Sequence, residues 1–150
     1  MVSVAPLPAS LASFEWTGSG GVPLAASAAG PLGADIGVLF AHGFGQTRQA
    51  WTRSMLALGQ ASIASAAYDL RGHGQSGRNA ADERYDVEQF IDDALAVRST
   101  LAQPPVLVGA SMGGLVGLAA QSRGAGFAGL VLVDVTPKWE IAGMQRILAF

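Results

Sequence analysis

Residues 106–122 read VLVGASMGGLVGLAAQS, and this stretch determines the class of fold. It begins with the continuous apolar run 106–108, which is typical of a strand buried on both faces of a parallel sheet. Residues 112–122 predict a helix, and Gly124 or Gly126 predicts its end. Only the short, Gly-containing turn at residues 109–111 separates the two. The stretch therefore predicts a tight strand–turn–helix unit in an α/β protein.

Similar apolar runs recur along the chain, at residues 38–41, 65–68 and 130–133. Helical segments are predicted between them. One is marked by Trp51, Met55 and Leu58 and is expected to end at Gly59; the other spans residues 87–101. Asp86 with Gln89 resembles a capping box at the start of the second helix. Strands that alternate with helices predict right-handed crossovers and a doubly wound, mostly parallel sheet. Residues 11–16 and 22–28 predict a hairpin that precedes it.

Composition limits the classes of function. The 150 residues are 50% hydrophobic and 13% charged, with a net charge of -2 and no cysteine. We expect a single domain over residues 1–150, with no nucleic-acid or membrane partner. Thiol catalysis and Cys-ligated zinc are excluded. No Lys or Arg precedes Arg48, so the basic start of a secretory signal is missing. No apolar run approaches the roughly 20 residues of a membrane span, so a soluble, cytoplasmic protein is expected.

Polar or glycine-rich sequence follows several predicted strands, at residues 42–45 (HGFG), 69–74 (DLRGHG), 109–114 (GASMGG) and 134–137 (DVTP). Ligands of open parallel sheets bind beyond the carboxyl ends of the strands. We therefore expect these four segments to surround the functional site.

Ser111 is the predicted nucleophile of that site. It is the serine of a G-x-S-x-G sequence placed directly after a strand and directly before a helix, which is the context of a nucleophile elbow. Gly109 and Gly113 would remove side chains that clash in such a tight turn. The helix dipole and the N–H of Met112 favour negative charge beside the hydroxyl. The alternative is a Gly-rich turn in which Ser111 only caps the helix.

Taken together, the segments 42–45, 69–76 and 109–114 resemble the α/β-hydrolase family in motif, order and spacing, over residues 14–150. The resemblance implies an oxyanion hole made by the backbone N–H groups of Phe44 and Met112, with His42 and Gly43 supporting the loop. The segment 69–76 would be structural and would shape the floor of the pocket. Residues 138–150 would begin the cap over the pocket.

The implied activity is that of a serine hydrolase such as an esterase. Ser111 would form an acyl-enzyme with a small-molecule ester, lactone, thioester or activated C–C bond, without a metal or organic cofactor. Within the family, epoxide hydrolases and dehalogenases use an aspartate at the elbow, so Ser111 argues against their chemistry. A cofactor-free perhydrolase (haloperoxidase) remains an alternative.

The sequence departs from the family pattern in its histidines. The triad order in this fold is Ser, then Asp or Glu, then His, yet the two histidines, His42 and His73, both precede Ser111. Either could lie near Ser111 as a base, or could simply brace a loop. Asp134 is a candidate acid, or a strand-end aspartate with local backbone bonds. We expect the chain to be the N-terminal portion of a longer α/β-hydrolase, truncated after the strand that follows the nucleophile helix and inactive alone. The remainder of the same polypeptide, or a complementing chain, would supply the histidine.

Parts of the sequence also match two other functions. Residues 72–77 match G-x-G-x-x-G, but no helix opens there and no suitably spaced acidic residue follows, so nucleotide binding is disfavoured. A non-catalytic ligand-binding protein on the same fold remains open, because a fold alone does not establish function.

Overall fold

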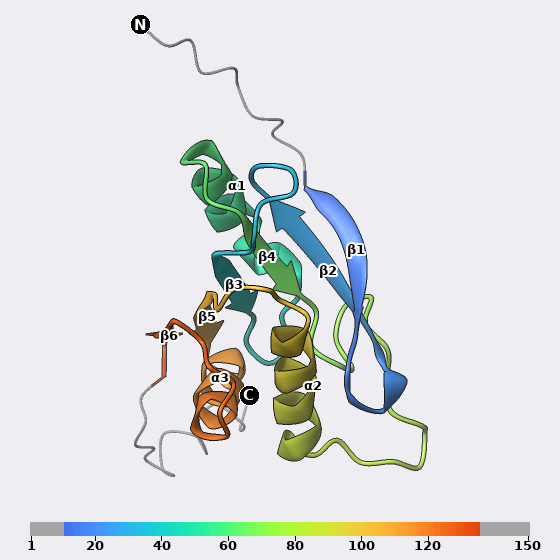
Figure 1. Ribbon diagram of the computed structural model, residues 1–150. Coiled ribbons are helices and arrows are strands. Elements are labelled where there is room, and N and C mark those ends of the chain that lie inside the picture. Colours follow the sequence, from blue (N-terminus) through green and yellow to red (C-terminus); the bar gives the residue numbers. More distant parts are fainter. Residues whose placement is uncertain (1–10, 136–150) are drawn as a thin grey trace, which may run out of the picture.

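The computed structural model describes residues 11–135, which form a six-stranded sheet with helices on both faces (Figure 1). The strands lie in the order β1-β2-β4-β3-β5-β6. Their bounds are β1 (Ala12–Thr17), β2 (Pro23–Ala29), β3 (Val38–Ala41), β4 (Ser65–Tyr68), β5 (Val106–Ala110) and β6 (Gly129–Val133).

Strand direction follows the sequence pattern. The hairpin strands β1 and β2 are antiparallel, and β2 also pairs antiparallel with β4. The pairs β4–β3, β3–β5 and β5–β6 are all parallel. The predicted doubly wound, mostly parallel sheet is therefore confirmed, and the predicted hairpin lies at its edge.

Helices cover the two faces unequally. α1 (Thr52–Gln60) is preceded by a 3-10 turn, η2 (Arg48–Trp51), and packs on one face. On that face Met55 contacts Phe40 and Ala67. α2 (Val87–Ser99) and α3 (Met112–Ser122) lie side by side on the other face (Figure 1). Apolar side chains of β2, β3, β4 and β5 form the larger core beneath them.

Two predicted helix ends differ from the structure. The first helix does not end at Gly59 but continues to Gln60, because the chain turns only at Ser62, which has a φ of 61°. The second was expected to reach residue 101 but ends at Ser99, where Thr100 Oγ1 donates to the carbonyl of Val97 (2.7 Å). Its predicted capping box at Asp86 is confirmed.

β6 is the edge of the described sheet, and one of its faces is open. Val131 and Val133 project to that face and are 47% and 39% exposed. The helix predicted to begin at residue 138 lies outside the described residues. Within residues 11–135, no helix combines the length and apolar character that crossing a membrane requires.

Candidate active site

The carboxyl ends of the parallel strands converge at one edge of the sheet. Ala41 pairs with Gly109 of β5 on one side and with Tyr68 of β4 on the other. Ala110 pairs with Val133 of β6. The segments that leave these strands are therefore neighbours in space, as the sequence predicted.

Ser111 occupies a strained turn between β5 and α3. Its φ of 45° and ψ of -114° are unusual for a residue with a side chain, and such conformations cost roughly 1–3 kcal/mol. Its N–H donates to the carbonyl of Val133 (2.9 Å), and its carbonyl accepts the first bond of α3 from Leu115 (3.1 Å). The surroundings thus hold an exposed serine at the positive end of a helix.

Glycines make this turn possible by allowing α3 to lie against the strand ends. A Cβ on Gly109 would lie 2.5 Å from Gly114 Cα, and one on Gly113 would lie 2.6 Å from the carbonyl carbon of Ala41. Both clashes involve backbone, which cannot move aside cheaply. A Cβ on Gly114 would likewise lie 2.8 Å from Gly109 O, a constraint that sequence reasoning did not assign.

The loop after β3 lies against this turn. A Cβ on Gly43 would be 3.5 Å from both Ser111 Cβ and the carbonyl oxygen of Ala110. Gln46 folds back on Gly43. The Gln46 side-chain oxygen accepts the Gly43 N–H (3.0 Å), and the Gln46 backbone N–H donates to the Gly43 carbonyl (3.1 Å). Phe44 is next in the chain, and this residue is 77% exposed. The loop that carries Phe44 therefore lies beside Ser111, which directly precedes Met112.

His42 is buried and uses both ring nitrogens on backbone. The N–H of Leu70 donates to Nε2 (2.9 Å), so the ring proton must sit on Nδ1, which donates to the carbonyl of Gly43 (2.7 Å). Burial lowers the pKa of His42 from its ordinary value, and the nearby His73 lowers it further. A neutral ring with no free nitrogen braces the loop and does not act as a base.

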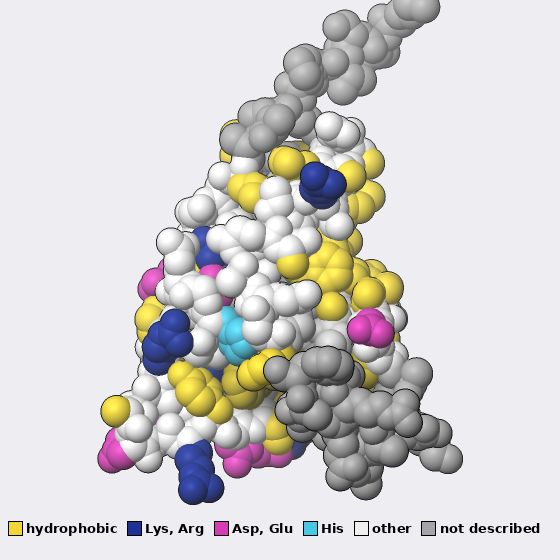
Figure 2. Space-filling model, turned by 180° about the vertical axis from the view of Figure 1, so that it is seen from behind, with side chains coloured by type: hydrophobic (Ala, Val, Ile, Leu, Met, Phe, Trp, Pro, Cys, Tyr) yellow, Lys and Arg dark blue, Asp and Glu magenta, His cyan; other side chains and the backbone are white. Residues whose placement is uncertain are grey.

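His73 is engaged in a similar way. Its Nε2 accepts the N–H of Gly45 (3.2 Å), and its Nδ1 lies 3.0 Å from the carbonyl of Arg71. Histidine surface is visible in Figure 2 beside hydrophobic side chains. The alternative that one of these two histidines is the base is thus disfavoured by their hydrogen bonds.

The loop after β4 begins with a buried ion pair. The Asp69 carboxylate pairs with the guanidinium of Arg48, and both side chains are almost wholly buried. It also accepts the N–H of Arg48 (2.6 Å) and that of Gln75 (2.9 Å). Gly74 lies so close to this carboxylate that no side chain fits there. This carboxylate therefore organises both its own loop and the start of η2.

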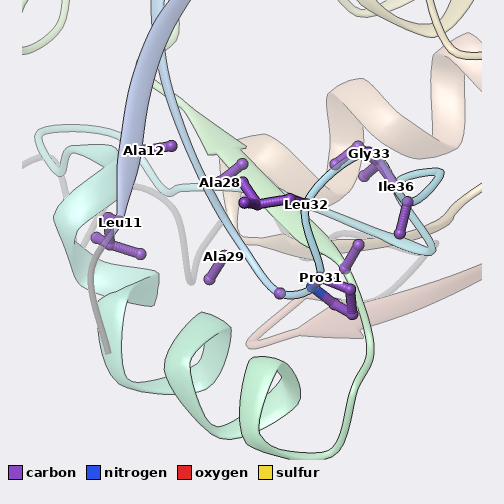
Figure 3. Close-up of a pocket in the computed structure, with 11 residues that line it drawn as sticks. Leu11, Ala12, Ala28, Ala29, Pro31, Leu32, Gly33 and Ile36 are labelled. Carbon is purple, nitrogen blue, oxygen red and sulfur yellow. The ribbon is translucent and has the colours of Figure 1, made fainter. Parts of the chain in front are cut away.

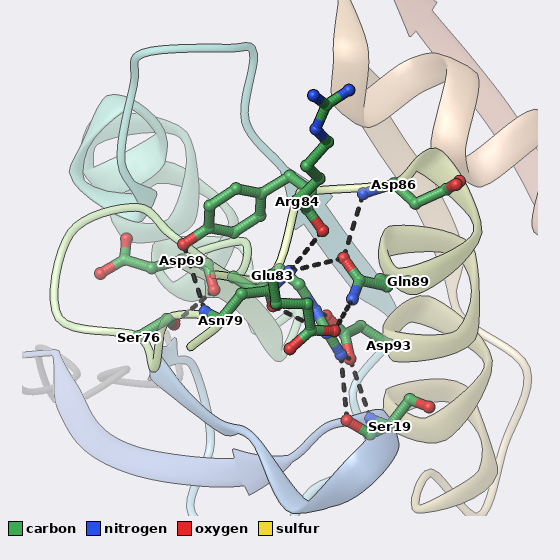
Figure 4. Close-up of polar contacts among 11 residues, drawn as sticks. Ser19, Asp69, Ser76, Asn79, Glu83, Arg84, Asp86, Gln89 and Asp93 are labelled. Atoms are coloured by element: carbon green, nitrogen blue, oxygen red, sulfur yellow. Dashed lines mark hydrogen bonds and ion pairs between the residues drawn. The ribbon is translucent and has the colours of Figure 1, made fainter. Parts of the chain in front are cut away.

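A second buried pair ties the same loop to α2 and to the hairpin. Arg71 donates to both carboxylate oxygens of Asp93 (2.7 and 2.6 Å) and to the carbonyl of Ser19 (3.0 Å). Figure 4 shows Asp93 on α2 facing this loop, with Asn79 and Gln89 bonded above it. These contacts give the segment 69–76 the structural role that the resemblance implied.

Sequence reasoning missed Arg48 and Asp93. Asp93 follows Phe90 and precedes Val97 at helical spacing, so it falls on the apolar stripe of α2. A charged residue on the apolar stripe of a helix indicates that it pairs with an opposite charge in the core, and this was the signal that could have identified Asp93. Arg48 carries no comparable signal.

Asp134, the candidate acid, directly follows Val133, whose carbonyl binds Ser111. It is exposed and has a φ of 55°. Asp134 thus lies beside the elbow, and its role as the acid of the triad stays a prediction.

A cavity of about 230 Å³ lies at the opposite end of the strands (Figure 3). Ala28 and Ala29, which line it, pair with the first residues of β4, whereas Ser111 is beyond the last residues of β5. The residues around it are all apolar or glycine, so it holds no group for chemistry.

Comparison with known proteins gives consistent matches. A sequence model described as "Alpha/beta hydrolase family" matches residues 38–150. An alpha/beta hydrolase from Novosphingobium aromaticivorans is 26% identical with a TM-score of 0.78, and the match covers 93% of this chain and 50% of that one. Epoxide hydrolase A from Mycobacterium thermoresistibile is 28% identical with a TM-score of 0.71, covering 93% and 44%. The thioesterase domain from the curacin biosynthetic pathway is 28% identical with a TM-score of 0.76, covering 93% and 52%. The chain spans about half the length of these structures.

Proposed function

Because the chain belongs to the alpha/beta hydrolase family, we propose that it carries the nucleophile of a serine hydrolase, Ser111. The observation that supports this proposal is the conformation of Ser111. It is an exposed serine held at a φ of 45°, between a strand of the sheet and the N-terminus of α3. Strain of this kind at a non-glycine residue is typical of functional sites.

The proposed reaction is acyl transfer. Ser111 Oγ attacks the carbonyl carbon of the substrate as its proton passes to a base, and the carbonyl electron pair becomes an oxyanion. The N–H groups of Met112 and Phe44 stabilise this oxyanion; loss of one such donor typically costs about 10²–10³ in rate. Collapse expels the leaving group, which takes the proton, and water then cleaves the acyl-enzyme.

The base is proposed to come from the remainder of the polypeptide or from a complementing chain. His42 and His73 are the chain's two histidines, and both direct their ring nitrogens to backbone groups. Asp134 is the candidate acid for that histidine, since it follows the residue whose carbonyl binds Ser111.

The substrate class is a small molecule with an ester, lactone, thioester or activated C–C bond. One matched structure is a thioesterase domain, which supports an acyl thioester among these. Another is an epoxide hydrolase. The family resemblance implies an aspartate at the elbow for that chemistry, whereas this chain has Ser111 there. That difference favours acyl transfer.

Covalent labelling tests the proposal. The protein expressed from its complete reading frame is treated with a fluorophosphonate, and the modified peptide is mapped by mass spectrometry. We expect one label on Ser111 and none in Ser111→Ala. Ser122→Ala is the matched control, because Ser122 lies at the exposed end of the same helix and should leave labelling unchanged. An unlabelled protein that still binds acyl ligands would instead indicate a binding role.

A further inference from the structure

The loop that carries Phe44, residues 42–48, is attached to the loop after β4 at three points. At its start, His42 Nε2 accepts the N–H of Leu70 (2.9 Å). At its end, Arg48 pairs with Asp69. Between them, the N–H of Gly45 donates to His73 Nε2 (3.2 Å). The third contact holds the exposed tip of the loop, which has few other contacts to fix its conformation.

Two successive peptide groups flank Phe44, and each is bound by one histidine. A trans peptide is planar, with its C=O and N–H pointing in opposite directions. His42 Nδ1 donates to Gly43 O (2.7 Å) and thereby orients the peptide that contains the Phe44 N–H. His73 accepts the Gly45 N–H of the next peptide. The Gln46 N–H also donates to Gly43 O (3.1 Å), so the first peptide is held by two donors and the second by His73. The direction of the Phe44 N–H depends on these contacts together.

His73 is itself fixed from behind. Its Nδ1 lies 3.0 Å from the carbonyl of Arg71, and the guanidinium of Arg71 is bound to Asp93 through two hydrogen bonds. Its ring also packs edge-on against Phe44, with centroids 5.7 Å apart. His73 is therefore a hydrogen-bond acceptor whose ring is held in place by Arg71, the residue that forms the buried ion pair with Asp93.

The backbone of Gly45 is the group that the hydrogen bond to His73 restrains. Its φ of 72° lies in the left-handed region, and a Cβ placed on it would meet no described atom within 4 Å outside its two chain neighbours. A glycine at an exposed loop tip has many accessible conformations. The hydrogen bond to His73 selects one of them.

We propose that His73 is a positioning residue of the oxyanion hole, which acts by holding the Gly45 amide and so aiming the N–H of Phe44 at the substrate oxygen. This inference rests on the proposed function of Ser111. His73 does not touch the substrate in this role; a hydrogen-bond acceptor at the position of its Nε2 is what matters.

Two amide substitutions separate the acceptor from the bulk of the ring. A glutamine side chain reaches about as far as Nε2, so His73→Gln can still accept the Gly45 N–H. The shorter His73→Asn ends near Nδ1 and cannot. Arg123→Gln, on the exposed surface of the helix pair, is the control for an unrelated substitution.

The experiment measures kcat and KM for an activated ester, and amide hydrogen exchange at Gly45 by NMR, on the protein from its complete reading frame. We expect His73→Asn to speed exchange at Gly45 and to lower kcat about 10- to 100-fold with little change in KM, as misplacement of a catalytic donor does. His73→Gln should recover most of both, and Arg123→Gln should match the wild type.

Two results would overturn the proposal. One is a His73→Asn variant with wild-type kcat; the other is a His73→Gln variant as slow as His73→Asn, which would show that only the ring's packing matters. Ser111→Ala distinguishes this failure from failure of the proposed function. If Ser111→Ala keeps its activity, both proposals fall; if it is inactive while His73→Asn is fully active, only the role of His73 is refuted.

Discussion

Substitution of either partner of the buried pair Arg48–Asp69 should destabilise the fold, and the two substitutions should differ in their cost. Both side chains are almost wholly buried, at 7% and 0% exposure. Removing one partner of such a pair leaves an uncompensated charge and typically costs about 3–5 kcal/mol. That is a large share of the roughly 5–15 kcal/mol that stabilises a typical domain.

The two single substitutions should not cost the same. In Arg48→Met, the Asp69 carboxylate still accepts two backbone N–H groups, at 2.6 and 2.9 Å, so the cost should lie near the lower bound of about 3 kcal/mol. Asp69→Val removes the acceptor of both N–H groups and strands the guanidinium with Ser27 and Gln75. Each unsatisfied N–H adds about 1–3 kcal/mol, which moves the total to about 5 kcal/mol or more.

Urea denaturation of the wild type, both single variants and the double variant measures this directly. The double variant should be more stable than the sum of the single losses predicts, because no unpaired charge remains. A cost below about 1 kcal/mol for either single variant would refute the reasoning, since it lies far under the expected range for a buried pair. So would a larger loss for Arg48→Met than for Asp69→Val.

Two further predictions follow from the packing of the site. Gly109→Ala should cost at least about 1–3 kcal/mol, because its Cβ meets backbone at 2.5 Å, whereas Gly37→Ala, whose Cβ meets nothing closer than 3.6 Å, should be nearly neutral by thermal melting. Equal melting temperatures would contradict this account of the elbow. Stability should also fall as the pH drops below the ordinary histidine value of 6.5, because burial lowers the pKa of His42 and the unfolded chain then binds more protons than the native one. Urea midpoints between pH 5 and 7.5 test this, with a flatter profile expected for His42→Asn; an unchanged profile in that variant would assign the effect to another group.

Much of the fold could be predicted because its strands are short, buried and bounded by polar residues. The runs 38–41 and 65–68 coincide with β3 and β4. A buried parallel strand needs apolar residues on both faces, so its ends are marked where His42 and Asp69 follow. The bounds of α3 were equally clear, because Ser111 and Gly124 delimit it.

Contacts between distant segments could not be predicted in the same way. Arg48 and Asp69 are 21 residues apart, and Arg71 and Asp93 are 22 apart. Charged residues normally lie in solvent, so local sequence gives no reason to pair them. The place of β4 between β2 and β3 likewise depends on the whole sheet.

The histidines illustrate the same limit within the candidate site. Their position after β3 and β4 placed them near the elbow from sequence alone. Whether a ring nitrogen is free for catalysis depends on its hydrogen bonds, which only the three-dimensional arrangement reveals. Those bonds direct both rings to the backbone of the loop that carries Phe44.

Trapping the acyl-enzyme is the test of Ser111 as nucleophile. The protein from its complete reading frame is mixed with an activated acetyl ester, quenched in acid within the first turnover, and analysed by intact and peptide mass spectrometry. The account predicts one added acetyl group, located on the peptide that contains Ser111 and absent from Ser111→Ala. Turnover of the ester with no acyl group on Ser111, or with full activity in Ser111→Ala, would contradict it.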